Sequence, residues 1–209
     1  MRIKQMEQTT FPLIGMARLR MGIDGSGITT LVAGAGCPLR CKWCINQKLL
    51  QEAPVRHVTA QELLDLVKKD DLYYRATGGG ITFGGGESLL HVSFIRAFRQ
   101  VCPAEWRISV ETSLCVPETQ VATAADAADT FIIDCKDMNA EIYKRYTGGD
   151  PSLMVRNLRY LLERKNPEQI LVRVPLIPEY NTEADQEASR KKLLEMGVKN
   201  LDLFKYVRR

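Results

Sequence analysis

The chain has 209 residues, of which 45% are hydrophobic, and its 29 basic and 25 acidic residues give a formal net charge of +4. A chain of this length buries roughly 70% of its unfolded surface and needs no disulfides for stability, and the nearly balanced charge does not favour a nucleic-acid-binding protein. The apolar runs are too short to span a membrane, and no long apolar run opens the chain, so we expect no membrane span and no signal peptide. Six cysteines in such a chain indicate a reducing cytoplasm, where cysteines bind metals or take part in catalysis.

Strand and helix patterns alternate along the chain, which predicts βαβ units and a parallel sheet. The predicted strands cover residues 11–23, 28–33, 81–83, 107–111, 131–136, 170–177 and 201–207. The predicted helices cover 88–101, 117–128, 139–146, 153–164 and 182–196, with a further helix that begins at the capping box Thr59–Glu62. After the cysteine loop, a polar connection through Pro54 is expected. About six strands in a βα order favour an incomplete barrel or an open sheet in a single domain, 1–209, because a full eight-stranded barrel needs about 250 residues.

Three cysteines, Cys37, Cys41 and Cys44, follow the second predicted strand at the spacing C-x3-C-x2-C. Thiolates are soft ligands that suit zinc or iron–sulfur clusters. A structural zinc site has four protein ligands, whereas this loop supplies three, and neither His57 nor His91 has a sequence relation to it. Three thiolates on a four-iron cluster leave one iron open for a substrate, and this interpretation is favoured. Zinc with a distant fourth ligand and three unliganded cysteines are the alternatives.

Polar and glycine residues lie at the ends of the later predicted strands, or within one of them. They are Gly84, Gly85, Gly86, Glu87, Glu111, Thr112, Asp134, Lys136 and Arg173. Because the carboxyl ends of parallel strands open on one side of a sheet, we expect these residues to meet at one mouth.

Each of these features has a structural alternative. The triple glycine lets backbone amides and carbonyls approach a ligand closely, or simply makes a tight turn. Asp134 and Lys136 share a face of their strand, where they bind a ligand with both charges or form a salt bridge at the strand end. Arg173 either points inward to hold a carboxylate or points out to solvent. Trp43 packs on an adenine or shields the cluster.

The remaining cysteines show no metal-ligand spacing with one another, and the histidines have no sequence relation to the cysteine loop. Cys135 points away from Asp134 and Lys136 and is predicted to lie in the core. Cys102 and Cys115 are expected to be buried apolar residues. His57 and His91 are expected at the surface.

Taken together, these motifs resemble the radical S-adenosylmethionine (SAM) enzymes, and among them the activating enzymes of glycyl radical enzymes, of which pyruvate formate-lyase activating enzyme is the best-known member. The cysteine spacing with an aromatic residue before the last cysteine is the superfamily's signature. Asp24–Ile28 resembles the family's D-G-P-G-I motif, Cys44–Asn46 its C-x-N motif and Gly80–Glu87 its G-x-T-x-S-G-G-E motif. Glu111–Thr112 resembles its D-T motif, Asp134–Lys136 its D-x-K motif and Val172–Pro178 its arginine strand.

The resemblance implies a partial (β/α)6 barrel that holds a 4Fe–4S cluster through the three cysteines. It implies that SAM chelates the open iron and is cleaved to a 5′-deoxyadenosyl radical by an electron from a flavodoxin or ferredoxin. The radical would then take a hydrogen atom from a glycine of a partner enzyme. SAM contacts are implied for Asn46, Gly84 to Glu87 and Lys136, and we expect Trp43 and Arg173 to contact the cofactor as well. A monovalent cation beside the SAM carboxylate is implied for Glu111, Thr112 and Asp134.

The chain departs from the family pattern at several positions. Gly84 stands where the family has Ser, and Ser88 stands where it has Pro. Glu111 replaces Asp, so we expect the cation site to be altered or absent. The cysteine loop is followed by no ferredoxin-like insert, and the early end at Arg209 predicts an open mouth. Two other functions remain open: a radical SAM enzyme that acts on a small molecule or a peptide, and a metal-binding module without SAM chemistry.

Overall fold

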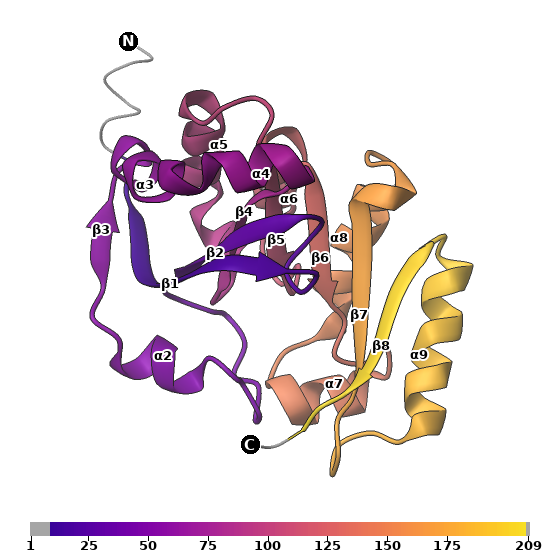
Figure 1. Ribbon diagram of the computed structural model, residues 1–209. Helices are drawn as coiled ribbons and strands as arrows, with labels where there is room; N and C mark the ends of the chain where they lie inside the picture. The colour runs from indigo at the N-terminus through magenta and orange to yellow at the C-terminus, as the bar shows by residue number, and fades with distance from the viewer. Residues whose placement is uncertain (1–8, 208–209) are drawn as a thin grey trace.

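One mixed sheet organises the chain in the computed structural model, which describes residues 9–207 (Figure 1). Its strands are β1 (Phe11–Met21), β2 (Ile28–Gly34), β3 (Arg56–Val58), β4 (Gly80–Gly85), β5 (Arg107–Thr112), β6 (Thr130–Asp134), β7 (Ile170–Leu176) and β8 (Asn200–Lys205). They lie in the order β3-β1-β2-β4-β5-β6-β7-β8. The predicted single domain, 1–209, extends at both ends beyond the described residues.

The helices are α2 (Gln47–Glu52), α3 (Ala60–Val67), α4 (Asp71–Thr77), α5 (Val92–Val101), α6 (Glu118–Ala127), α7 (Ala140–Thr147), α8 (Pro151–Leu162) and α9 (Glu183–Glu195). Short 3-10 turns cover Lys68–Asp70, Ser88–His91 and Pro167–Gln169. None of the helices in residues 9–207 has the length and hydrophobicity that a membrane crossing requires.

The predicted parallel arrangement is confirmed. Strands β2, β4, β5, β6, β7 and β8 are parallel neighbours, each joined to the next by a connection that contains at least one helix. β1 pairs antiparallel with β2, and β3 pairs antiparallel with β1. The sheet is therefore six parallel strands extended at one edge by two antiparallel ones.

The sequence predicted the long elements and missed the short ones. The capping box of Thr59 and Glu62 begins α3 as expected. The expected polar connection through Pro54 instead contains α2, which buries none of its residues, and is followed by β3, which has only three residues. Such short elements carry too little hydrophobic periodicity to detect. α4 was also not predicted, and the predicted helix 88–101 begins as a 3-10 turn.

The two faces of the parallel strands differ in chemistry. Outward side chains such as Ile81, Phe83 and Val110 are fully buried and belong to one hydrophobic core, together with Phe94 and Phe98 of α5. Figure 1 shows α5, α6 and α8 behind the sheet and α9 beside β7 and β8. Burial of this apolar face drives folding at about 25 cal/mol per Å² of area removed from water.

The expected burial is confirmed for Cys102 and Cys135, whereas Cys115 is only partly buried. Cys102 and Cys135 lie in the hydrophobic core, and Cys115 is half-buried with its Sγ 3.0 Å from Tyr143 Oη.

Both histidines lie at the surface to different degrees. His57 is exposed, whereas His91 is half-buried: its ring Nε2 lies 2.7 Å from the carbonyl oxygen of Ala35, and its ring packs edge-to-face with Phe11.

Candidate functional site

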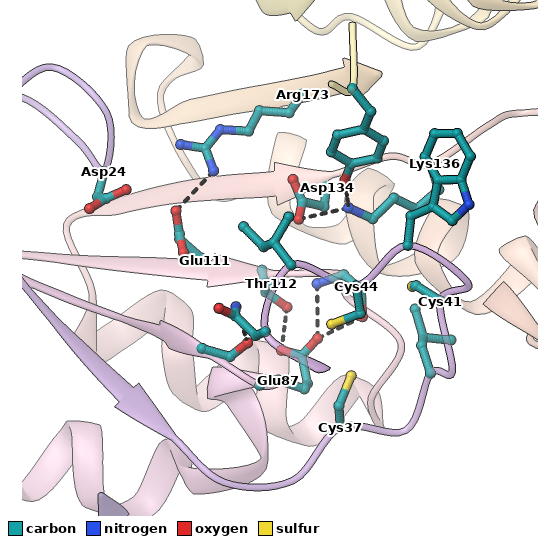
Figure 2. A pocket seen from close by; sticks show the side chains of 18 of the residues that line it. Asp24, Cys37, Cys41, Cys44, Glu87, Glu111, Thr112, Asp134, Lys136 and Arg173 are labelled. Atoms are coloured by element: carbon teal, nitrogen blue, oxygen red, sulfur yellow. Dashed lines mark hydrogen bonds and ion pairs between the residues drawn. The ribbon is translucent and has the colours of Figure 1, made fainter. Parts of the chain in front are cut away.

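A cavity of 580 Å³ lies inside the partial barrel and reaches the carboxyl ends of the parallel strands. Every sequence-predicted site residue except Gly84 lines it. The lining residues are Arg20, Gly22, Ile23, Asp24, Leu31, Cys37, Leu39, Cys41, Trp43, Cys44, Ile45, Asn46, Gly85, Gly86, Glu87, Glu111, Thr112, Ser113, Asp134, Lys136, Tyr146, Arg173, Asp202, Phe204 and Tyr206. Figure 2 shows the three cysteines on one side of this cavity and Asp24 on the other, with Glu111 and Arg173 between them.

The cysteine loop is fixed to the barrel on two sides. On one side the backbone amides of Arg40 and Lys42 donate to the carbonyls of Thr147 and Tyr146, at 2.9 and 3.0 Å, which fastens the loop to the end of α7. On the other side the side-chain amide of Asn46 donates to the carbonyl of Gly85 at 2.8 Å. The loop therefore keeps its position over the strand ends through contacts within the protein.

The three thiols are free and converge on the cavity. Burial raises the pKa of Cys37, and raises the pKa of Cys41 to about 12. Metal binding by Cys37 and Cys41 would therefore have to release their protons. Across residues 9–207, no three His, Cys, Asp or Glu side chains are already gathered around a single ion position. Three thiols of one loop on one cavity, with no fourth ligand beside them, fit a cluster better than a closed zinc site.

The glycines at the end of β4 are required by the close approach of the segment that leads into the cysteine loop. Gly85 has a φ of +88°, and a Cβ on Gly86 would lie 2.0 Å from the carbonyl oxygen of Gly36. The amides of Gly86 and Glu87 donate to the carbonyls of Gly34 and Gly36, at 3.0 and 2.9 Å. The glycines therefore do form a tight turn, as the structural alternative predicted. Gly85 and Gly86 also line the cavity, so a ligand could still approach the turn.

Glu87 is 2% exposed and its carboxylate is saturated with hydrogen bonds. It accepts from Thr112 Oγ1 at 2.6 Å, from the amide and hydroxyl of Ser113 at 2.8 and 2.6 Å, and from the amide of Leu89 at 3.2 Å. Burial raises the pKa of this carboxyl, and the hydrogen bonds partly oppose that effect. Glu87 therefore ties the glycine turn to the end of β5, a role that the sequence did not predict.

Asp134 and Lys136 meet as predicted, with Lys136 Nζ 3.0 Å from Asp134 Oδ2. The strand ends at Asp134, two residues earlier than expected. Lys136 is buried and also donates to Tyr206 Oη at 2.9 Å. Burial lowers the pKa of Lys136, but Asp134 and Tyr206 more than offset this, so the pKa lies above its ordinary value. Tyr206 was not predicted as a site residue, because it lies 70 positions from Lys136 and no motif around it indicates a contact with that lysine.

Arg173 points into the cavity, which excludes the alternative of an outward side chain. Its Nη1 donates to Glu111 Oε1 at 2.9 Å, and its Nη2 donates to the carbonyl of Ile23. In the sheet it lies in one row between Asp134 and Asp202, and its Nε is 3.9 Å from Asp202 Oδ2.

A second ion pair lies near Arg173, on the turn before β2. Arg20 pairs with the buried Asp24, whose backbone carbonyl accepts from Thr82 Oγ1 at 2.5 Å. The sequence missed Arg20 and Asp202 as cavity residues, since neither follows the carboxyl end of a predicted strand.

Trp43 lies beside the cysteine loop against other aromatic side chains. Its ring packs edge-on against Tyr180 at a centroid distance of 6.0 Å, and Tyr146 packs against the same tyrosine at 5.0 Å. Tyr146 Oη is also 3.5 Å from the carbonyl oxygen of Trp43. Trp43 is therefore half-buried on protein partners at the edge of the cavity.

Comparison with known proteins places this arrangement in a family. Residues 31–190 match the model of the radical SAM superfamily. The chain is 27% identical to the (2S)-3-sulfopropanediol dehydratase activating enzyme of Klebsiella oxytoca, over 88% of this chain and 78% of that protein. It is 31% identical to the indoleacetate decarboxylase activating enzyme of Tractidigestivibacter scatoligenes, over 78% of this chain and 72% of that protein.

Solved structures support the fold. QueE from Escherichia coli matches 96% of both chains with a TM-score of 0.54 at 10% identity. Streptococcus suis SuiB bound to S-adenosylmethionine matches 83% of this chain with a TM-score of 0.64 at 12% identity, and this chain spans 39% of its length. These likenesses show a shared partial-barrel architecture, for which a 4Fe–4S cluster and SAM are the cofactors that the superfamily implies. The chain is a radical SAM enzyme, and it belongs with the activating enzymes of glycyl radical enzymes.

Proposed function

We propose that this protein activates a partner glycyl radical enzyme by removing a hydrogen atom from a glycine of that partner. The observation that carries the proposal is the convergence of three thiols, Lys136 and Arg173 on one cavity. Such a cavity offers soft ligands for a cluster and two cations for a carboxylate within the same enclosure. The relatives that match most of the chain are activating enzymes, which supports the same reaction.

In the proposed mechanism Cys37, Cys41 and Cys44 would hold the 4Fe–4S cluster. Reductive cleavage of SAM at such a cluster supplies methionine and a 5′-deoxyadenosyl radical, which becomes 5′-deoxyadenosine when it takes a hydrogen atom. Lys136 and Arg173 would bind the SAM carboxylate, and Lys136 is oriented for this by its hydrogen bond to Tyr206.

The turn from Gly84 to Glu87 would receive the SAM ammonium group through its backbone carbonyls. Asn46 and Trp43 would border the bound SAM and restrict the access of water to it.

Exposed apolar side chains at the cavity support a protein substrate. Ile23 and Ile45 line the cavity and yet are 58% and 87% exposed. Large apolar side chains with this exposure beside a polar cavity are typical of an interaction site. A glycine-bearing loop of the partner would cover them as it enters the cavity.

A basic surface beside the cysteine loop supports an acidic electron donor such as a flavodoxin or ferredoxin. Arg40 and Lys42 on the loop, and Lys144 and Arg145 at the end of α7, are all exposed. The backbone bonds between the loop and α7 bring these cations together. Positive charge near the site of electron entry steers an acidic carrier toward it. The six free cysteines support a reducing cytoplasm as the compartment.

The monovalent cation that the resemblance implies does not fit the described side chains. Thr112 Oγ1 donates to Glu87, Asp134 accepts from Lys136, and Glu111 accepts from Arg173. Glu111 and Asp134 are thus each paired with a side-chain cation, and a positive ion beside Arg173 and Lys136 would be repelled by them. We therefore include no cation in the proposed mechanism.

The test is anaerobic reconstitution followed by incubation with SAM, a strong reductant and a candidate glycyl radical enzyme. The expected result is a glycyl radical signal in the electron paramagnetic resonance spectrum, with one 5′-deoxyadenosine formed for each radical. A cluster that cleaves no SAM would overturn the proposal. Deoxyadenosine formed only with a small molecule or peptide would replace the activase function by the alternative radical SAM function.

A further inference from the structure

We propose that Arg173, held by Glu111, replaces the monovalent cation in this chain, and that Gly84 makes the replacement sterically feasible. The proposal rests on the proposed function in assuming that SAM binds in the cavity. It makes SAM binding independent of potassium or sodium ions, and it assigns Gly84 and Glu111 as a coupled pair of positioning residues.

The Arg173–Glu111 contact has the character of a permanent internal ion pair. Both side chains are largely buried, with exposed fractions of 16% and 20%, and the guanidinium has further partners in the carbonyl of Ile23 and the carboxylate of Asp202. A guanidinium fixed on several sides in a cavity loses little conformational freedom when a ligand carboxylate arrives. It can therefore face Glu111 on one side and a SAM carboxylate on the other, as a bound cation would.

Gly84 is the position that allows Glu111 to adopt this pose. A Cβ built on Gly84 would lie 2.6 Å from Glu111 Oε2 and 3.0 Å from Leu31 Cδ1. These distances are shorter than a van der Waals contact permits, so a serine at this position would shift Glu111 Oε2. We expect this shift to disturb the contact that Glu111 Oε1 makes with Arg173. The additional methylene of Glu111 and the missing side chain of Gly84 are thus complementary departures from the Asp and Ser of the family pattern.

Side-chain cations already accompany the two carboxylates that the resemblance assigns to the monovalent cation. Glu111 Oε1 pairs with Arg173 at 2.9 Å, and Asp134 Oδ2 pairs with Lys136 at 3.0 Å. A positive ion placed beside these two carboxylates would also lie near the guanidinium and the ammonium group, which repel it.

The test measures SAM affinity and melting temperature of the reconstituted protein in potassium chloride and in tetramethylammonium chloride at equal ionic strength. Thallium-205 NMR, with Tl⁺ as a probe for K⁺, measures cation binding directly in the same samples. For the unaltered protein we expect equal SAM affinities in both salts and no bound Tl⁺. A saturable, potassium-specific gain in affinity or melting temperature, or stoichiometric Tl⁺, would overturn the proposal.

Two substitutions test the coupling. Gly84→Ser alone should weaken SAM binding about tenfold, because it displaces a charge-assisted hydrogen bond. Adding Glu111→Asp should restore most of the affinity and make it potassium-dependent, since the shorter side chain no longer reaches Arg173. Gly15→Ser is the matched control, because a Cβ there meets Leu49 at an ordinary 3.6 Å. Additive losses in the double variant would contradict the coupling.

The test separates this inference from the proposed function. SAM that binds without activating any glycyl radical enzyme removes the proposed function and leaves the cation result valid. A reconstituted protein that binds no SAM contradicts the proposed function, and the Tl⁺ titration then still decides whether the chain has a cation site.

Discussion

The outward face of the parallel strands packs the hydrophobic core, whereas the inward face of the same strands forms the site. On β4 and β5 the outward Phe83 and Val110 are fully buried against helices, whereas the inward Thr82 and Glu111 hydrogen-bond or ion-pair inside the barrel. Successive side chains of a strand point to opposite faces, so one residue step separates the core from the site. The outward face is held by area of contact, and the inward face by specific polar partners. Substitutions on the outward face should therefore lower the stability of the protein, whereas those on the inward face should weaken ligand binding.

The largest expected effect is on the cysteine loop. Cys41→Ala should abolish cluster binding completely while the fold remains, because Cys41 lines the cavity and its loss leaves only two of the three expected protein ligands for a four-iron cluster. Iron and sulfide content and the visible absorbance after reconstitution measure this. Cys102→Ala is the matched control, since Cys102 lies in the core behind the sheet, and it should keep its cluster. An intact cluster in Cys41→Ala would refute the ligand assignment.

On the outward face, Phe83→Ala should lower the free energy of unfolding by about 3–5 kcal/mol, as expected for a large side chain removed from a packed core. Phe83 contacts the rings of Phe11, Phe94 and Phe98. Urea denaturation of the cluster-free protein measures the change. Leu72→Ala, at a side chain that is 75% exposed, should change stability by less than about 0.5 kcal/mol. Equal losses for the two variants would show that the outward face does not carry the fold.

On the inward face, Tyr206→Phe should weaken SAM binding about fivefold with little change in stability. The substitution removes the hydrogen bond that orients Lys136, and such a bond contributes about 1 kcal/mol. Calorimetric titration with SAM measures the affinity. Tyr73→Phe, at an exposed tyrosine on α4, serves as the control. A loss of stability that equals the loss of affinity would mean that Tyr206 belongs to the core.

The smallest expected effects are two pH signatures of opposite sign. The hydrogen bond from Arg18 lowers the pKa of Asp70 below its ordinary 3.8, so the stability from this pair is present above that pH and is lost as the pH falls through the lowered value. Asp70→Asn should therefore lose less stability on acidification than the unaltered protein.

Glu87 should show the reverse. Burial raises its pKa above the ordinary 4.5, so its contribution to stability is present below that pH and is lost as the pH rises through the raised value. Relative to the unaltered protein, Glu87→Gln should gain stability as the pH rises from about 4 toward neutrality. Urea denaturation at a series of pH values measures both variants. Parallel curves of unfolding free energy against pH for Glu87→Gln and the unaltered protein would contradict a raised pKa of the buried Glu87 carboxyl.

Much of the fold was predictable because the long elements have strong local signals. The parallel strands are β-branched or apolar, and the Thr59 capping box marks its helix. The antiparallel pairing of β1 and the three-residue β3 were not predictable, since pairing direction depends on partners distant in sequence. For the site, the positions of strand ends were enough to identify Glu87, Asp134 and Lys136. Tyr206 reaches the cavity only because the end of the chain pairs with β7, where the amide of Tyr206 donates to the carbonyl of Leu176.

By itself, the sequence determined the thiol spacing, the order of strands and helices, and the set of charges at the strand ends. These are local properties, since spacing, periodicity and composition are written in short stretches of chain. Only the tertiary structure decided which charges are partners. Arg173 and Glu111 are joined across 62 positions of sequence. Gly84 lies against Glu111 solely because their strands are neighbours in the sheet. The cavity's electrostatics follow from that packing, because a buried charge takes its properties from whatever the fold brings within hydrogen-bonding distance.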